Sequence, residues 1–117
     1  MQTKRKSVRK ILIRALVFQE EDWLCVRCLE YDLATQARTL PQLYKNLNRL
    51  ILGHIAVRVH HNQRPFLSLS PAPRKYWDMF ERSKIPLSVH AVNFRPVRSN
   101  GFVVPPPQVR VAPPNAA

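Results

Sequence analysis

The chain has 117 residues, of which 45% are hydrophobic, and a formal net charge of +12 at pH 7. This length fits one domain with a small core, and the apolar content favours a folded chain over a disordered one. No apolar run approaches the roughly 20 residues that a membrane-spanning helix needs, so no membrane partner is expected. The two cysteines, with no signal-peptide pattern before them, predict reduced thiols and a cytoplasmic location.

The positive charge is unevenly distributed along the chain. Residues 1–10 carry five basic residues and no acid, residues 11–57 carry five of each sign, and residues 58–117 carry nine basic residues against two acids. We therefore expect a neutral folded unit with basic flanks rather than a fold built around a cationic groove. The first segment has no apolar periodicity and is interpreted as a basic flexible arm spanning residues 1–10.

Three short strands are predicted after this arm. Residues 11–18 alternate with apolar character on both faces, and residues 23–29 form a second alternating run. The polar break at residues 19–22 suits a hairpin between them. Residues 33–38 predict a shorter and more polar strand at a sheet edge, which would permit a homo-oligomer formed by strand pairing.

A helix is predicted to begin after Thr39. Gln42 follows three residues later, which is the spacing of a capping box, and Pro41 falls in the first turn, where its missing N–H costs nothing. Apolar residues at helical spacing then give one broad face. They are Leu40, Leu43, Tyr44, Leu47, Leu50, Ile51 and His54. Gly53 weakens the last turn, so the helix is expected to end between residues 52 and 57.

The remainder of the chain combines proline-rich stretches with short elements. A short extended run is predicted at residues 66–69, a short helix at 74–83 and a further strand at 87–94. The folded domain is thus expected to span residues 11–95. The proline-rich residues 96–117 are expected to form an extended or disordered tail.

The predicted order of strand, hairpin, strand, turn, short strand and Thr-capped helix resembles the HicB-like antitoxin domain. The residues that carry the likeness are VFQEEDWLCVRC (17–28), Asp32-Leu33 and TLPQL (39–43). They are similar to the family's acidic hairpin with its second strand, its Asp-Leu turn and its helix start. Residues 66–69 also lie where the family places a strand after the helix. The likeness covers residues 11–57, and extends to about residue 70 if that run is a strand.

The resemblance implies an α+β fold in which a three-stranded antiparallel meander packs on a helix, of a partial ribonuclease-H-like type without its catalytic acids. It implies no enzyme, but the antitoxin of a HicA/HicB-type toxin–antitoxin system, which binds a small RNA-cleaving toxin and is usually oligomeric. The expected partner is a small basic toxin protein, and the acids at the two turns are the expected contacts. They are Glu20, Glu21, Asp22, Glu30 and Asp32.

The alternative is a small basic protein that binds RNA or DNA through its arms. Cations without nearby acids bind phosphates in a salt-sensitive way, and Tyr76 and Trp77 beside two of them would allow stacking on single strands. The candidate phosphate contacts are Lys4, Arg5, Lys6, Arg9, Lys10, Arg74 and Lys75. In the competing interpretation, Tyr76, Trp77 and Phe80 only pack a short helix onto the sheet.

The sequence predicts neither a metal site nor a catalytic centre. Cys25 and Cys28 have the spacing of zinc ligands, but residues three apart on a strand point to opposite faces. The seven acids are divided among turns and a short helix, so no set of carboxylates converges for two-metal catalysis. With only two glycines, no phosphate-binding loop can be drawn. We predict no catalytic residue, no bound metal and no cofactor.

Overall fold

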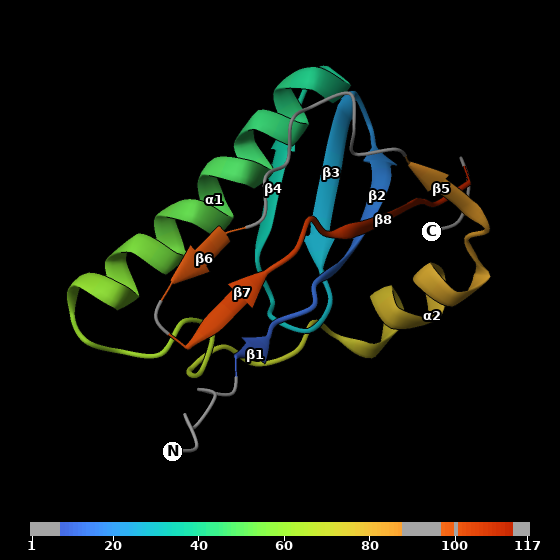
Figure 1. The fold of residues 1–117 in the computed structure, drawn as a ribbon. Coiled ribbons are helices and arrows are strands. Elements are labelled where there is room, and N and C mark those ends of the chain that lie inside the picture. The colour runs from blue at the N-terminus through green and yellow to red at the C-terminus, as the bar shows by residue number, and fades with distance from the viewer. Residues whose placement is uncertain (1–7, 88–96, 100, 114–117) are drawn as a thin grey trace, which may run out of the picture.

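Two helices and two β-sheets form the part of the chain that the computed structural model describes, which is residues 8–87, 97–99 and 101–113 (Figure 1). The elements in chain order are β1 (Arg9–Lys10), β2 (Arg14–Glu20), β3 (Trp23–Cys28), β4 (Ala34–Ala37), α1 (Leu40–His60), α2 (Arg74–Arg82), β5 (Ile85–Leu87), β6 (Val97–Ser99), β7 (Phe102–Val104) and β8 (Gln108–Val111). The protein is therefore mixed α+β.

The predicted antiparallel meander is confirmed in β2, β3 and β4. The first two strands pair from Ala15 opposite Cys28 to Glu20 opposite Trp23, and a tight turn with Glu21 at a φ of 54° joins them. The β4 strand pairs with β3 and forms an edge of its sheet, as its polar sequence predicted. Successive side chains of β2 point to opposite faces of the sheet, and each face has its own hydrophobic cluster. Ala15 and Val17 belong to the cluster under α1, and Leu16 belongs to the cluster with Phe80 of α2.

The helix α1 begins after Thr39 as predicted, with the Thr39 half of the capping box formed and the Gln42 side chain donating to the Asn46 side-chain carbonyl oxygen instead. Thr39 is the N-cap, its hydroxyl accepts a hydrogen bond from the Gln42 backbone N–H at 3.4 Å, and Pro41 occupies the first turn. The buried face comprises Leu43, Tyr44, Leu47, Ile51 and Ile55. The predicted end at residues 52–57 is wrong, since the helix continues to His60. A side chain at Gly53 would meet only open space, and burial of Ile55 two residues further on stabilises the continued helix.

The larger sheet has five strands in the order β4-β3-β2-β8-β5, and β8 runs parallel to β2 (Figure 1). The structure thus differs from the expected domain end at residue 95. The segment expected as a tail supplies a central strand, and Val109 is only 2% exposed. Phe102 and Val104 are buried in the same core. Prolines 105–107 lie between β7 and β8, outside both strands, so their missing N–H groups cost no hydrogen bond of the sheet. The proline content of this segment therefore concealed two strands in the sequence.

Residues 66–69 form a turn and not the predicted strand. Phe66 has a φ of 67°, and its carbonyl accepts a hydrogen bond from the Leu69 N–H at 3.0 Å. The side chain of Phe66 is 1% exposed, so burial of its ring offsets the strained backbone. The short helix at 74–83 is confirmed as α2. Of the predicted strand at 87–94, residue 87 ends β5 and the rest lies outside the described residues.

The smaller sheet has the order β1-β7-β6 and places part of the predicted arm in regular structure. Arg9 and Lys10 pair in parallel with Phe102 and Val103, and both basic side chains are exposed. Residues 1–7 of that arm lie outside the described part. Within the described ranges, neither helix is both long and apolar enough to cross a membrane.

Candidate functional site

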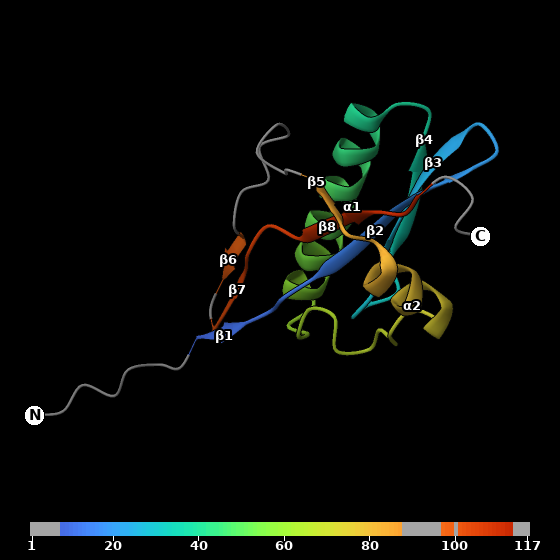
Figure 2. The same ribbon diagram turned by 90° about the vertical axis from the view of Figure 1, so that its right-hand side faces the viewer.

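One face of the larger sheet is only partly covered. The helix α1 packs over β3 and β4 on one side, whereas the nine-residue α2 lies on the other side beside β2 (Figure 2). On that second side β3 presents Trp23, Cys25 and Arg27. From α2 the Tyr76 ring reaches Arg27, and Cys25 is 7% exposed, so side chains close this part of the sheet more thinly than α1 closes the other side. A sheet face usually packs against another layer, so this thinly covered area is a candidate binding surface.

Two adjoining hollows follow this face, and together we call them the trough. The α2 hollow, of about 330 Å³, lies between β2 and α2. Its lining residues are Phe18, Gln19, Glu20, Lys75, Tyr76, Asp78, Met79 and Arg82. The strand hollow, of about 300 Å³, continues across β3 to β4. Its lining residues are Phe18, Glu20, Cys25, Val26, Arg27, Ala34, Thr35, Gln36 and Tyr76.

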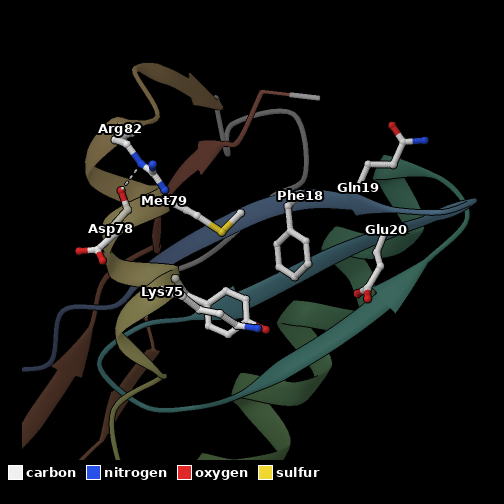
Figure 3. Close-up of a pocket in the computed structure, with 8 residues that line it drawn as sticks. Phe18, Gln19, Glu20, Lys75, Asp78, Met79 and Arg82 are labelled. Atoms are coloured by element: carbon white, nitrogen blue, oxygen red, sulfur yellow. Dashed lines mark hydrogen bonds between the residues drawn. The ribbon is translucent and has the colours of Figure 1, made fainter. Parts of the chain in front are cut away.

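The base of the trough is apolar. Phe18 on β2 and Met79 on α2 point into the space between their elements (Figure 3). The rings of Phe18 and Tyr76 pack with centroids 5.7 Å apart and planes tilted by 33°. On α2, Tyr76, Met79 and Phe80 follow i, i+3, i+4 spacing, which turns all three toward the sheet. Phe80 is buried there and Trp77 is half-buried, so the packing interpretation of these aromatic residues is confirmed.

Arginine side chains stack on the aromatic residues around the trough. The Arg27 guanidinium lies 4.4 Å from the centroid of the Tyr76 ring, and its Nε is 3.1 Å from an Asp32 oxygen. The Arg38 guanidinium lies 4.0 Å from the centroid of the Trp23 ring. Such cation–π contacts hold long side chains in defined positions at a surface. Arginine, tyrosine, tryptophan and methionine are also the residues enriched at protein interfaces.

The five acids predicted as partner contacts do not form one free patch. Glu30 pairs with Arg14 at 2.6 Å, and Asp22 lies 3.9 Å from Arg38. Asp32 is paired with an arginine as well. Glu20 lines the trough and Glu21 is exposed at the hairpin turn. The acids therefore mostly neutralise arginines of the sheet, and only Glu20 among them faces the trough.

The predicted phosphate contacts are dispersed over the molecule. Arg74 and Lys75 are exposed in the first turn of α2, and the Lys75 Nζ lies 5.0 Å from the centroid of the Tyr76 ring. Arg9 and Lys10 are exposed on β1, in the smaller sheet. The candidates at positions 4, 5 and 6 lie outside the described residues.

The two cysteines occupy opposite faces of β3, as strand alternation predicted. Cys28 is enclosed in the α1 core, where burial and then the carboxylates of Glu30 and Asp32 raise its pKa to about 12. Cys25 lines the strand hollow, and burial followed by the nearby Glu20 carboxylate raises its pKa. Both thiols are therefore protonated near neutral pH and are weak nucleophiles. Among the described residues, no three His, Cys, Asp or Glu side chains are arranged to hold a metal.

His54 has a structural position instead of a catalytic one. Its Nε2 accepts a hydrogen bond from the Phe66 backbone N–H at 2.9 Å. Its ring stacks on the Phe66 ring, with the two ring centroids 4.8 Å apart. Burial, and then the charge of Arg58, lower the pKa of His54. The neutral imidazole thus holds the turn after α1.

Sequence reasoning missed the trough because it depends on where α2 lies. Alternation in 23–29 placed Trp23, Cys25 and Arg27 on one face, but nothing local placed Tyr76 and Met79 beside that face. Comparison with known proteins adds no further assignment. No family model, curated protein or solved structure matches the chain.

Proposed function

We propose that this protein is a non-catalytic partner-binding module of HicB-like, partial ribonuclease-H-like fold. The support is the β2-β3-β4 meander followed by the Thr-capped α1, together with a return strand, β8, beside β2. The single observation that carries a binding role is the trough, an aromatic and arginine-rich face that α2 covers only thinly. In this proposal the partner is a small protein that covers the trough, as in an antitoxin that neutralises a toxin.

The charge of the trough favours a protein partner over a nucleic acid. Among the residues that line the trough, Arg27 is paired with Asp32, and the cations Lys75 and Arg82 are matched in number by the acids Glu20 and Asp78, so little net positive charge is presented there. Binding to phosphates depends on uncompensated cations. A mixed surface of paired charges around an aromatic base instead has the composition of a protein–protein interface.

Co-expression tests this role. The chain is produced together with a small basic RNA-cleaving toxin of HicA type, sought first among the genes next to its own, and both co-purification and relief of growth inhibition are measured. Gln36→Trp would fill the strand hollow from an exposed position on β4, and Gln42→Trp makes the same change on the exposed side of α1. We expect only the first variant to abolish co-purification and relief. If the toxin neither binds nor is neutralised, the antitoxin role is contradicted.

Nucleic-acid binding is a second candidate, and the segregation of charge favours it. Residues 33–77 contain seven basic residues and no acid. Within the described ranges, Lys45 and Arg49 on α1 and Arg9 and Lys10 on β1 make no ion pair. These uncompensated cations lie away from the trough, so the two surfaces would act separately.

Fluorescence anisotropy with a labelled single-stranded RNA tests the second candidate. Binding is expected at about 50 mM salt and should weaken steeply toward 200 mM. Lys45→Gln with Arg49→Gln should lower both affinity and salt slope, whereas Arg27→Gln with Arg38→Gln, which removes cations already paired with carboxylates, is the control on the trough side. Removing residues 1–7 spares β1 and isolates the contribution of the N-terminal cations. Absence of binding at the lowest salt would exclude this candidate.

A further inference from the structure

Three arginines on the α2 side of the sheet share one arrangement. Each guanidinium lies over an aromatic ring and also pairs with a carboxylate. The three sets are Arg14 with Trp77 and Glu30, Arg27 with Tyr76 and Asp32, and Arg38 with Trp23 and Asp22. The ring and the carboxylate thus hold each cation from two sides, which combines a cation–π contact with a charge-assisted pair.

A fourth ring and carboxylate on this face have no cation between them. Phe18 and Glu20 are two residues apart on β2, so both side chains emerge on the trough side, and both line the two hollows. In the part of the chain that is described, no lysine or arginine lies over the Phe18 ring, and Glu20 makes no ion pair. Among the described residues, the Glu20 carboxylate accepts one long contact, from the Cys25 thiol at 4.0 Å.

The cations that line the α2 hollow are directed elsewhere. The Lys75 ammonium lies over the ring of Tyr76. The Arg82 Nε donates a hydrogen bond to the Asp78 backbone carbonyl at 3.3 Å (Figure 3). The Asp78 carboxylate, which makes no ion pair in the described residues, adds negative charge to the same hollow.

We propose that the trough receives an arginine side chain of the partner protein, with its guanidinium over the Phe18 ring and paired with Glu20. The inference rests on the proposed function, since it names the group that the partner would insert. Arginine fits better than lysine because its planar guanidinium stacks on a ring and pairs with a carboxylate at the same time. The three internal sets show this geometry in the same surface.

The methyl group of Met79 gives a direct readout in the protein alone. The chain has two methionines, Met1 and Met79, so ¹³C-methyl labelling of methionine places one reporter in the trough. The probes are acetyl-Leu-Arg-Leu-amide and the same peptide with citrulline, which keeps the shape of arginine without its charge. We expect the arginine peptide to shift the Met79 resonance saturably, with an affinity at least several-fold above that of the citrulline peptide.

Two variants decide the residues involved. Glu20→Gln removes the carboxylate that would pair with the guanidinium and should abolish the preference for the arginine peptide. Glu21→Gln makes the same change on the exposed turn and should retain that preference. Phe18→Leu keeps an apolar residue and should weaken the arginine peptide several-fold. Equal affinities for the two peptides, no shift from either, or an unchanged preference in Glu20→Gln would overturn the proposal. The broader proposal that the trough binds a partner protein is tested separately, by the co-expression experiment with Gln36→Trp.

Discussion

The two faces of the five-stranded sheet differ in how they are closed. Under α1, a continuous apolar cluster fills the space between helix and strands, and Leu43 and Leu47 are completely buried. On the other face, the shorter α2 closes only the part beside β2 and leaves β3 and β4 to Arg27, Arg38 and the aromatic residues on which they stack. The first face stabilises the fold, and the second is the face that we propose as the binding surface.

The strand β3 shows this difference within six residues. Val26 and Cys28 point into the sealed core, and Cys25 and Arg27 point to the trough. Apolar side chains on the sealed side gain their free energy from burial, about 25 cal/mol per Å². Stacked arginines on the open side contribute far less to folding. Substitutions on the two faces should therefore separate stability from binding.

The largest expected effect is on the sealed face. Leu47→Ala should lower the free energy of unfolding by about 2–5 kcal/mol, because it leaves a cavity where the side chain is fully buried. Urea denaturation measures this loss. Leu52→Ala, at an exposed position one turn further along α1, should change stability by less than about 0.5 kcal/mol. Equal effects of the two variants would contradict a core under α1.

The second effect concerns the strand from the proline-rich segment. Val109→Ala should destabilise the protein by about 2 kcal/mol, since β8 lies beside β2 and this side chain is buried in the α1 core. Its exposed neighbour is the control, and Gln108→Ala should be nearly neutral in the same urea titration. A neutral Val109→Ala would show that the segment does not pack.

A third, smaller effect depends on pH. The folded state lowers the pKa of His54 below its ordinary value of 6.5, because burial and then the charge of Arg58 disfavour the protonated ring. The unfolded chain therefore binds this proton more readily, so stability is complete above pH 6.5 and falls as the pH drops below that value. Urea unfolding between about pH 5 and pH 8 measures the slope.

The control for the pH effect uses a second histidine. His54→Gln, which can still accept the hydrogen bond, should reduce the slope below pH 6.5. His60→Gln, at the exposed end of α1, should leave the slope unchanged. A slope that survives in His54→Gln would assign the pH dependence to other groups.

The smallest effect is expected among the stacked pairs of the open face. A double-mutant cycle of Arg38→Met and Trp23→Leu should give a coupling energy of about 0.5–1 kcal/mol, because the cation–π contact is at the surface. Neither single variant should unfold the protein. A coupling energy of several kcal/mol would mean that this face also stabilises the fold.

The sealed face could largely be predicted from sequence, because its signals are local. The alternation of apolar and polar residues predicted the antiparallel meander. The helical spacing of Leu43, Leu47 and Ile51 after the Thr39 cap predicted the buried side of α1. The end of α1 was missed because tertiary packing of Ile55 outweighs the low helix propensity of Gly53.

The open face could not be predicted, because it depends on contacts between distant segments. Tyr76 meets Arg27 only after α2 has been placed, and β8 joins β2 across more than ninety positions of sequence. The prolines that suggested a tail also obscured the alternation around Val109. The turn at Phe66 escaped prediction since a positive φ at a phenylalanine has no local sequence signal.

The accessibility of the two thiols tests the difference between the faces most directly. Cys25 and Cys28 lie on one strand, at the trough and in the sealed core respectively. Native protein is treated with iodoacetamide at about pH 8.5, where only a small fraction of a thiol with a raised pKa is the reactive thiolate, and modification of each residue is followed by mass spectrometry. We expect Cys25 to react well before Cys28, whose modification should follow the global unfolding rate. Equal rates at the two cysteines would contradict an open trough opposite a closed core.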